Sequence, residues 1–248
     1  TILSGAEPIY VPLTPPTFSF DPEQLEDAFR QGAKALILCN PSNPSGKVFT
    51  YDELMIIRSI VLKYDAYVIT DEVYEHIIYP GHKHTYFASL PGMKERTISC
   101  SSLSKTYSIT GWRLGYVISS EEITDRVRKT HDFLTVAAAA PLQETAVTAL
   151  KFPLSYYDEL AALYNRKREL FLDGLKTLGF DYSEPQGAYF VMADISNFGY
   201  KDDTEFCIDL AQKVGVGAVP GSSFFRESIN NYIRNRPYRR GFNRCKSY

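Results

Sequence analysis

The stretch from Lys34 to Asp71 decides the fold class of this chain of 248 residues. It reads KALILC (34–39), NPSNPSGK (40–47), TYDELMIIRSIVLKY (50–64) and AYVITD (66–71). The first and last segments are short apolar runs typical of buried strands. Thr50 and Glu53 form a capping box that begins a helix ending near Tyr64. A strand, a loop, a helix and a second strand in this order predict one unit of a parallel sheet.

Further strands and helices flank this unit on both sides. Asp21 and Pro22 begin an earlier amphipathic helix, as its N-cap and its first-turn residue. The later elements that we expect are strands over 97–101 and 113–118, a helical region over 121–178 interrupted near Pro141 and Pro153, a strand over 188–195, a helix over 204–214 and a strand over 216–219.

The alternation of strands and helices predicts an α/β fold. We expect a large domain over residues 1–154, with a mostly parallel, doubly wound sheet flanked by helices. The pattern then changes to long helices followed by short strands, which predicts a smaller α+β domain over residues 155–248. The boundary would fall near Ser155, within the long helical region.

Composition and charge exclude several classes of protein. Hydrophobic residues make up 44% of the chain and charged residues 23%, and no run of about 18 apolar residues occurs, so we expect neither disorder nor a membrane span. There are 27 Lys and Arg and 29 Asp and Glu, but the last fourteen residues hold five basic groups and no acid. The remainder has 22 basic and 29 acidic groups, which argues against a nucleic-acid partner. We expect the basic end, 235–248, to be solvated.

The cysteine and histidine pattern argues against a metal site. The four cysteines, Cys39, Cys100, Cys207 and Cys245, form no Cys-x-x-Cys pair and no cluster with zinc spacing. His82 and His84 have no evident third ligand, so we expect them at the surface. The unpaired cysteines and the lack of a basic-then-apolar leader favour a reduced, cytoplasmic setting.

Polar side chains follow the ends of three predicted strands. They are Asn43 after the first strand, Asp71 and Tyr74 after the second, and Ser102, Ser104 and Lys105 after the third, with Arg113 at the start of the fourth. Ligands of open α/β sheets bind beyond the carboxyl ends of the strands, so we expect these side chains to share one crevice.

This set of side chains predicts a cofactor. A lysine can add to an aldehyde, a carboxylate can hold a protonated ring nitrogen, and hydroxyls with an arginine can bind a phosphate. Each feature alone is more often structural than catalytic, but the combination matches pyridoxal 5′-phosphate.

Three motifs carry a resemblance to a known family. They are NPSNPSGK (40–47), DEVY (71–74), and SLSK (102–105) followed by GWRLG (111–115). In this order and spacing they resemble the class I/II aminotransferases of fold type I, which depend on pyridoxal phosphate. The resemblance runs from Thr1 to about Arg234, and residues 9–20 and 71–96 look most like the bacterial aspartate, aromatic and kynurenine aminotransferase group.

The resemblance implies catalytic roles for three residues. Lys105 would hold the cofactor as an internal aldimine and, once freed, would move a proton between substrate and cofactor. Asp71 would keep the pyridine nitrogen protonated. Tyr74, together with Asn43, would hydrogen-bond the cofactor phenolate.

The resemblance also implies the remaining binding residues. Ser102, Ser104 and Arg113 would hold the phosphate, with Gly111 allowing a tight turn before the arginine. Arg234, in the segment NYIR (231–234), would grip the substrate α-carboxylate, with Asn43 beside it. The segments 187–190 and 220–224 resemble parts of the family that line the substrate side.

The implied function is transamination between an L-amino acid and a 2-oxo acid, within amino-acid metabolism, by a homodimer. Family members carry a further N-terminal stretch with a phosphate-binding turn and an aromatic residue that stacks on the ring, and residues 235–248 do not match the family's apolar strand and closing helix. We therefore expect an incomplete chain with weakened cofactor binding.

Three alternatives remain open. The first is another fold type I activity, such as a carbon–sulfur lyase, and the second is a truncated, non-catalytic remnant. A nucleotide-binding α/β protein is the third, but no Gly-x-Gly-x-x-Gly follows a strand.

Overall fold

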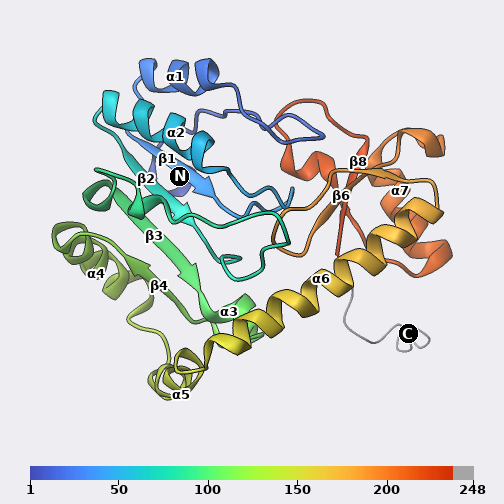
Figure 1. Ribbon diagram of the computed structural model, residues 1–248. Coiled ribbons are helices and arrows are strands. Elements are labelled where there is room, and N and C mark those ends of the chain that lie inside the picture. Colours follow the sequence, from blue (N-terminus) through green and yellow to red (C-terminus); the bar gives the residue numbers. More distant parts are fainter. Residues whose placement is uncertain (237–248) are drawn as a thin grey trace.

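The computed structural model describes residues 1–236, and its larger sheet contains the predicted β-α-β unit. The strands are β1 (Ala35–Cys39), β2 (Tyr67–Asp71), β3 (Thr97–Ser102) and β4 (Gly115–Ile118), paired in that order. The first three are parallel, and β4 runs antiparallel to β3 (Figure 1). The predicted mostly parallel α/β sheet is thereby confirmed.

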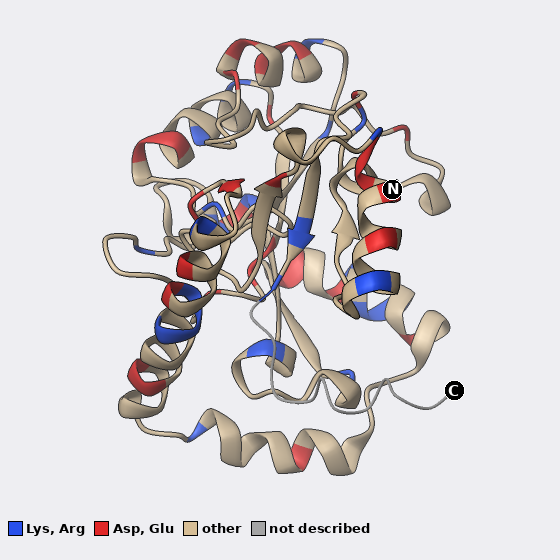
Figure 2. Cartoon of the chain, turned by 90° about the vertical axis from the view of Figure 1, so that its right-hand side faces the viewer, with Lys and Arg blue, Asp and Glu red and all other residues tan. Residues whose placement is uncertain are grey.

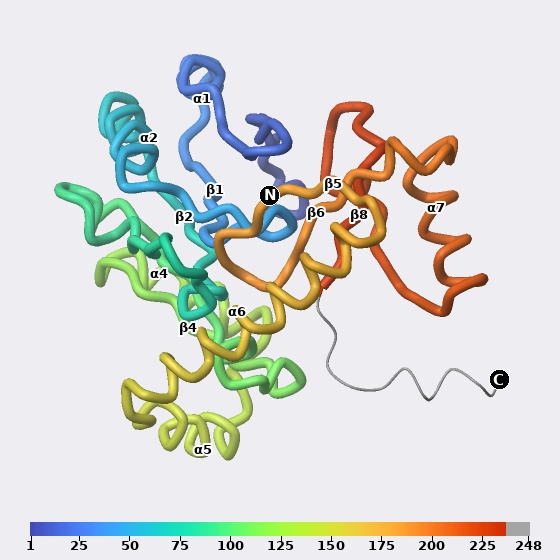
Figure 3. The backbone as a smooth tube through the Cα atoms, turned by 45° about the vertical axis from the view of Figure 1, so that its right-hand side comes forward, coloured from blue at the N-terminus to red at the C-terminus, as the bar shows by residue number. Residues whose placement is uncertain are grey.

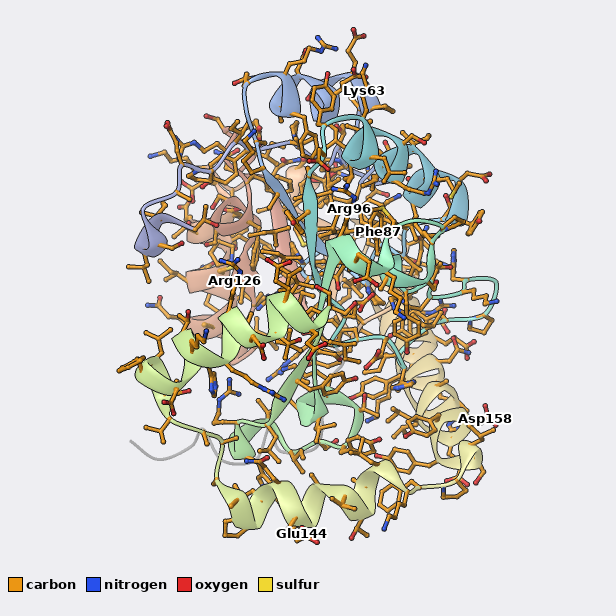
Figure 4. All side chains as sticks on the ribbon, turned by 90° about the vertical axis from the view of Figure 1, so that its left-hand side faces the viewer. Lys63, Phe87, Arg96, Arg126, Glu144 and Asp158 are labelled. Atoms are coloured by element: carbon orange, nitrogen blue, oxygen red, sulfur yellow. The ribbon has the colours of Figure 1, made fainter. Side chains whose placement is uncertain are left out.

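Two helices pack on this sheet and form the main core. They are α1 (Pro22–Arg30), whose N-cap Asp21 accepts a hydrogen bond from the Glu23 N–H, and α2 (Tyr51–Lys63), which begins at the predicted capping box. Apolar side chains of both helices meet the strands and Phe87, which is 1% exposed. Figure 4 labels Phe87 in the interior of the molecule and Lys63, the last residue of α2, at the edge of the molecule.

Four α-helices follow β3 before the second sheet begins, and all but the first and shortest of them lie in the predicted helical region, 121–178. They are α3 (Leu103–Thr106), α4 (Glu121–Thr135), α5 (Ala140–Leu150) and α6 (Leu154–Thr177). Pro141 lies in the first turn of α5 and Pro153 directly precedes α6, so the interruptions fall where expected. Figure 4 labels Arg126 on α4, Glu144 on α5 and Asp158 on α6.

The start of the fourth strand differs from the prediction. Arg113 is not in β4 but ends a short 3-10 turn, η4 (Thr110–Trp112), in a left-handed conformation with φ 57°. Gly111 has no such positive φ, so the expected role of this glycine in the turn is wrong. The sharp change of direction is made by Arg113 itself.

The second sheet is antiparallel. It has the order β5 (Asp181–Tyr182), β6 (Val191–Asp194), β8 (Tyr232–Asn235), β7 (Val219–Pro220), with α7 (Asp203–Asp209) continuing into a π turn, η6 (Leu210–Val214). The predicted strands over 188–195 and 216–219 are shorter than expected, and β5 and β8 were not predicted as strands. Figure 3 shows α6 passing from the first sheet to this smaller α+β unit.

Short 3-10 turns complete the described chain. The remaining ones are η1 (Ile2–Ser4), η2 (Phe87–Ser89), η3 (Lys94–Arg96), η5 (Ser196–Phe198) and η7 (Gly221–Phe224). Within residues 1–236 we find no helix with the length and apolar character that a bilayer span requires. Residues 237–248 lie outside the described part of the chain. They include Cys245 and most of the basic end that we expect to be solvated.

Candidate active site

The carboxyl ends of β1, β2 and β3 lie at one level. Asp71 is in register with Cys39 on one side and with Cys100 on the other. Asn40, which directly follows β1, donates its N–H to the Asp71 carbonyl at 3.0 Å. The Glu72 N–H donates to the Cys100 carbonyl at 2.9 Å. The three predicted loops therefore leave the sheet side by side.

The Asp71 carboxylate is exposed at this edge. Its Oδ1 accepts a long hydrogen bond of 3.3 Å from the Val73 N–H. The thiol of Cys39 is close by, and burial, followed by the charge of Asp71, raises the pKa of this thiol to about 12. The carboxylate thus lies beside an uncharged thiol, and it can accept a further hydrogen bond from a ligand.

Tyr74, three residues after Asp71, lies in an aromatic group. Its side chain is 3% exposed and meets Tyr189 edge-on, with 5.3 Å between ring centroids, and Phe190 at 5.7 Å. Burial and the neighbouring Tyr189 raise the pKa of the Tyr74 phenol. The hydroxyl therefore stays protonated at neutral pH and can donate a hydrogen bond.

Lys105 reaches the same aromatic group from the third strand. Its Nζ lies 5.9 Å from the centroid of the Tyr189 ring, so one tyrosine contacts both the lysine and Tyr74. Lys105 belongs to α3, a helix of four residues that follows its N-cap, Ser102, at the end of β3. The Tyr156 hydroxyl of α6 donates to the Thr106 carbonyl at 2.8 Å and fixes the end of this short helix.

Ser102 and Ser104 are engaged within the protein. The Ser102 Oγ accepts a hydrogen bond from the Ser104 N–H and lies 2.8 Å from the Leu114 carbonyl oxygen. The two hydroxyl oxygens are 2.7 Å apart, and Ser104 is 4% exposed. Ser102 therefore caps α3, a role that the sequence interpretation did not assign.

Arg113 directly follows η4, at the end of the turn that leads into β4. Its guanidinium is exposed and donates to the Thr110 carbonyl at 3.0 Å. It helps to line a hollow of about 870 Å³ over β4 and α4, together with Ser101, Arg128 and Lys129. Lys105 is not among the residues that line this hollow.

Arg234 comes from the second sheet and meets the loop after β1. In β8 it pairs with Met192 of β6 and Val219 of β7, and its Nη1 donates to the Asn43 Oδ1 at 2.9 Å. Partial burial lowers the pKa of the guanidinium. The two residues predicted to bind substrate are thus joined directly, although 191 positions separate them.

Phe190 connects this pair to the rest of the site. Its ring centroid lies 4.5 Å from the Arg234 Cζ and 5.7 Å from the Tyr74 ring centroid. Contacts therefore run without a break from Lys105 through two tyrosines and Phe190 to Arg234. The aromatic side chains at 189 and 190 give the site its continuity, and the sequence pattern gave them no individual role.

One further expectation is wrong. His84 is not a surface residue, because its side chain is 5% exposed and its Nε2 lies 3.6 Å from the Glu72 Oε1. The imidazole also meets the Tyr86 ring edge-on, with 4.6 Å between ring centroids, and its contact with Glu72, twelve positions away, has no local sequence signal. Across the described residues 1–236, no three or more His, Cys, Asp or Glu side chains are grouped so as to hold a metal ion.

Comparison with known proteins agrees with this geometry. The model of the family "Aminotransferase class I and II" matches residues 2–234. A probable N-succinyldiaminopimelate aminotransferase of Mycobacterium tuberculosis is 37% identical over 224 residues, which cover 90% of this chain and 56% of that protein. A kynurenine–oxoglutarate transaminase of Dictyostelium discoideum is 40% identical, over 86% of this chain and 54% of that protein.

Solved structures are similar over nearly the whole chain. The N-succinyldiaminopimelate aminotransferase from Mycobacterium tuberculosis has a TM-score of 0.91 at 35% identity, covering 95% of this chain and 62% of that one. YbdL from Escherichia coli, described as having a methionine aminotransferase function, has a TM-score of 0.86 at 31% identity, over 91% and 60% of the two chains. The chain thus spans a little over half the length of the relatives it matches.

Proposed function

The chain belongs to the class I and II aminotransferase family, and from this we propose that it serves a pyridoxal-phosphate-dependent transfer of an amino group. The donor is an L-amino acid and the acceptor a 2-oxo acid. The observation that carries this proposal is the unbroken set of contacts from Lys105 to Arg234. It joins an amine, a neutral phenol and a guanidinium through contacts between side chains.

The residues present fit pyridoxal 5′-phosphate by their chemistry. The exposed Asp71 carboxylate, with one long backbone contact, suits a protonated ring nitrogen. Tyr74 and Asn43 suit the ring oxygen, because a protonated phenol and an amide can both donate. The proposed phosphate ligands are Ser102, Ser104 and Arg113, of which the serines also hold α3. When bound, the cofactor supplies the electron-accepting ring that the reaction needs.

The protein's own part in the reaction is binding and proton transfer. We assign to Lys105 Nζ the proton that moves at the substrate α-carbon, because a lysine amine is a suitable general base once it is free. Tyr189 contacts Lys105, and Phe190 contacts Arg234, so the two aromatic side chains lie between the amine and the guanidinium. Arg234 orients the substrate through its α-carboxylate.

Several broader properties belong to the same proposal. The large domain would span residues 1–154 and the small domain 155–248, because α6 begins at Leu154 and leads into the second sheet. A homodimer is supported by large apolar side chains exposed on and after α4, where Phe133 is 91% and Leu134 76% exposed. Figure 2 shows that α5 nearby carries almost no charge. We also propose a cytoplasmic location.

Cofactor trapping tests the proposal. Pyridoxal 5′-phosphate is added to the chain, the adduct is reduced with borohydride, and the modified peptide is mapped. We expect labelling at Lys105 and its loss in Lys105→Ala, with Lys167→Ala as a control outside the site. A folded chain labelled equally at both lysines would contradict the proposal.

A second assay separates the alternatives. An amino acid and 2-oxoglutarate are supplied to the loaded protein, and the products are identified. Transfer yields glutamate, whereas a carbon–sulfur lyase yields pyruvate and ammonia.

A further inference from the structure

Two aromatic rings contact the Arg234 guanidinium. Its Cζ lies 4.5 Å from the centroid of the Phe190 ring and 4.7 Å from that of the Phe224 ring. A guanidinium donates hydrogen bonds only along its edge, in the plane of the group. One of these edge donors, on Nη1, is given to Asn43.

We propose that Phe224 is a positioning residue that orients Arg234 toward a planar carboxylate. The inference rests on the proposed function, since it specifies how the substrate α-carboxylate is recognised. Carboxylates bind guanidinium edge-on, through two parallel hydrogen bonds. Two rings in contact with the guanidinium limit its rotation and therefore favour this geometry over a single contact.

The turn that carries Phe224 is held in place by a close backbone approach and by hydrogen bonds. Gly221 approaches β8 so closely that a Cβ at this position would lie 2.5 Å from the Tyr232 carbonyl oxygen. Ser222, the next residue, donates from both its N–H and its hydroxyl to the Asp203 carboxylate, at 2.7 and 2.8 Å. Asp203 is itself 1% exposed, so the turn that carries Phe224 is anchored to the buried first residue of α7.

The neighbouring aromatic residue provides a matched control. Phe225 is directly adjacent in sequence, but its ring stacks on Phe18, with 6.5 Å between centroids. Phe225→Leu therefore removes an aromatic ring from the same turn without uncovering Arg234. Phe224→Leu removes the ring over the guanidinium while keeping an apolar side chain.

Binding of 3-phenylpropanoate, compared with its uncharged amide 3-phenylpropanamide, tests the proposal by calorimetry on the 248-residue chain. We expect the acid to bind more tightly than the amide, and Arg234→Gln to abolish this difference. Phe224→Leu should weaken binding of the acid about five-fold, in the range of a cation–π contact, and leave the amide unchanged. Phe225→Leu should stay within about two-fold of the parent chain.

The outcomes separate the two levels of the proposal. If Phe224→Leu binds the acid as Phe225→Leu does, while Arg234→Gln still loses it, the role of Phe224 is overturned and the carboxylate grip stands. If the parent chain binds acid and amide equally, both are overturned.

Ring-current shifts give an independent measure, because the Arg234 Nε–H resonance should move downfield in Phe224→Leu without any ligand. An unmoved resonance would also overturn the role of Phe224.

Discussion

Gly46 and Gly187 lie backbone against backbone. The Gly187 N–H donates to the Gly46 carbonyl at 2.8 Å, and a Cβ on Gly46 would lie 3.0 Å from the Gly187 carbonyl oxygen. Gly46 closes the loop that carries Asn43, and Gly187 precedes the segment that carries Phe190. Their close approach brings the loop of the large sheet to the small sheet, where Asn43 meets Arg234.

Replacing either glycine by alanine should destabilise the fold. Gly46 has a φ of +72°, and a Cβ on Gly187 would lie 2.9 Å from the Val48 Cγ2 and 3.0 Å from the Ile77 carbonyl oxygen. We expect a loss of about 1–3 kcal/mol in the free energy of unfolding, measured by urea denaturation. Gly174→Ala is the control, because nothing lies within 4 Å of that position in α6, and it should stabilise by about 0.5–1 kcal/mol. Equal effects at all three glycines would contradict the close approach.

The hydroxyl of Tyr79 is a second tie between the same segments. It donates to the Ala188 carbonyl at 2.7 Å, and the side chain is 2% exposed. Tyr79→Phe leaves this buried carbonyl without its donor and should cost about 1–2 kcal/mol at neutral pH. Tyr67→Phe, at a residue 44% exposed, should change stability by less than about 0.5 kcal/mol. Urea denaturation of both variants measures the difference, and a cost at Tyr79 no larger than at Tyr67 would argue against the tie.

Tyr79 also predicts how stability depends on alkaline pH. Burial raises the pKa of its phenol above the ordinary value of 10.0. The unfolded chain therefore loses this proton first, so the contribution is present below about pH 10 and declines as the pH rises beyond it. Urea unfolding between neutral pH and pH 11 should show a falling stability, and Tyr79→Phe should show a shallower fall. A slope unchanged by the substitution would mean that this phenol does not contribute.

Much of the large sheet could be predicted from local sequence. Thr50 with Glu53, and Asp21 with Pro22, are signals contained within a few residues, and the structure places helix starts at both. The apolar runs of β1 to β3 are equally local. Arg113 shows the limit, because the left-handed turn at this residue depends on how η4 packs and not on a glycine.

The candidate site was predictable only in part. The motifs gave the residue types, and the strand order gave the common edge of the sheet. The contact between Arg234 and Asn43 depends on β8, a four-residue strand whose pairing with β6 and β7 is formed across long stretches of chain. Such pairing has no periodic sequence signal of its own. The burial of His84 against Glu72 likewise depends on contacts in the folded chain and not on a local pattern.

The hydrogen bond between Arg234 and Asn43 should couple the two sheets energetically. A double-mutant cycle with Asn43→Ala and Arg234→Lys, measured by urea unfolding, should give a coupling energy of about 1–2 kcal/mol, because the bond has a charged donor. The distant pair Asn43→Ala and Gly174→Ala should be additive within about 0.5 kcal/mol. Additivity in both cycles would indicate that the bond does not link the sheets.

The short helix that carries Lys105 should depend on Tyr156. A helix of four residues has little stability of its own, and the hydroxyl of Tyr156 donates to the carbonyl of Thr106 at its end. The Tyr107 N–H, which donates to the Leu103 carbonyl, reports whether α3 is formed. We expect Tyr156→Phe to speed hydrogen exchange at this amide by about three- to ten-fold, equivalent to about 0.6–1.4 kcal/mol for one lost hydrogen bond.

Tyr157→Phe is the matched control, because its hydroxyl contacts the Tyr107 hydroxyl at 2.7 Å and not the backbone of α3, so its effect should be smaller. Exchange accelerated more by Tyr157→Phe than by Tyr156→Phe would place the support of Lys105 in the tyrosine side chains and not in the bond to Thr106.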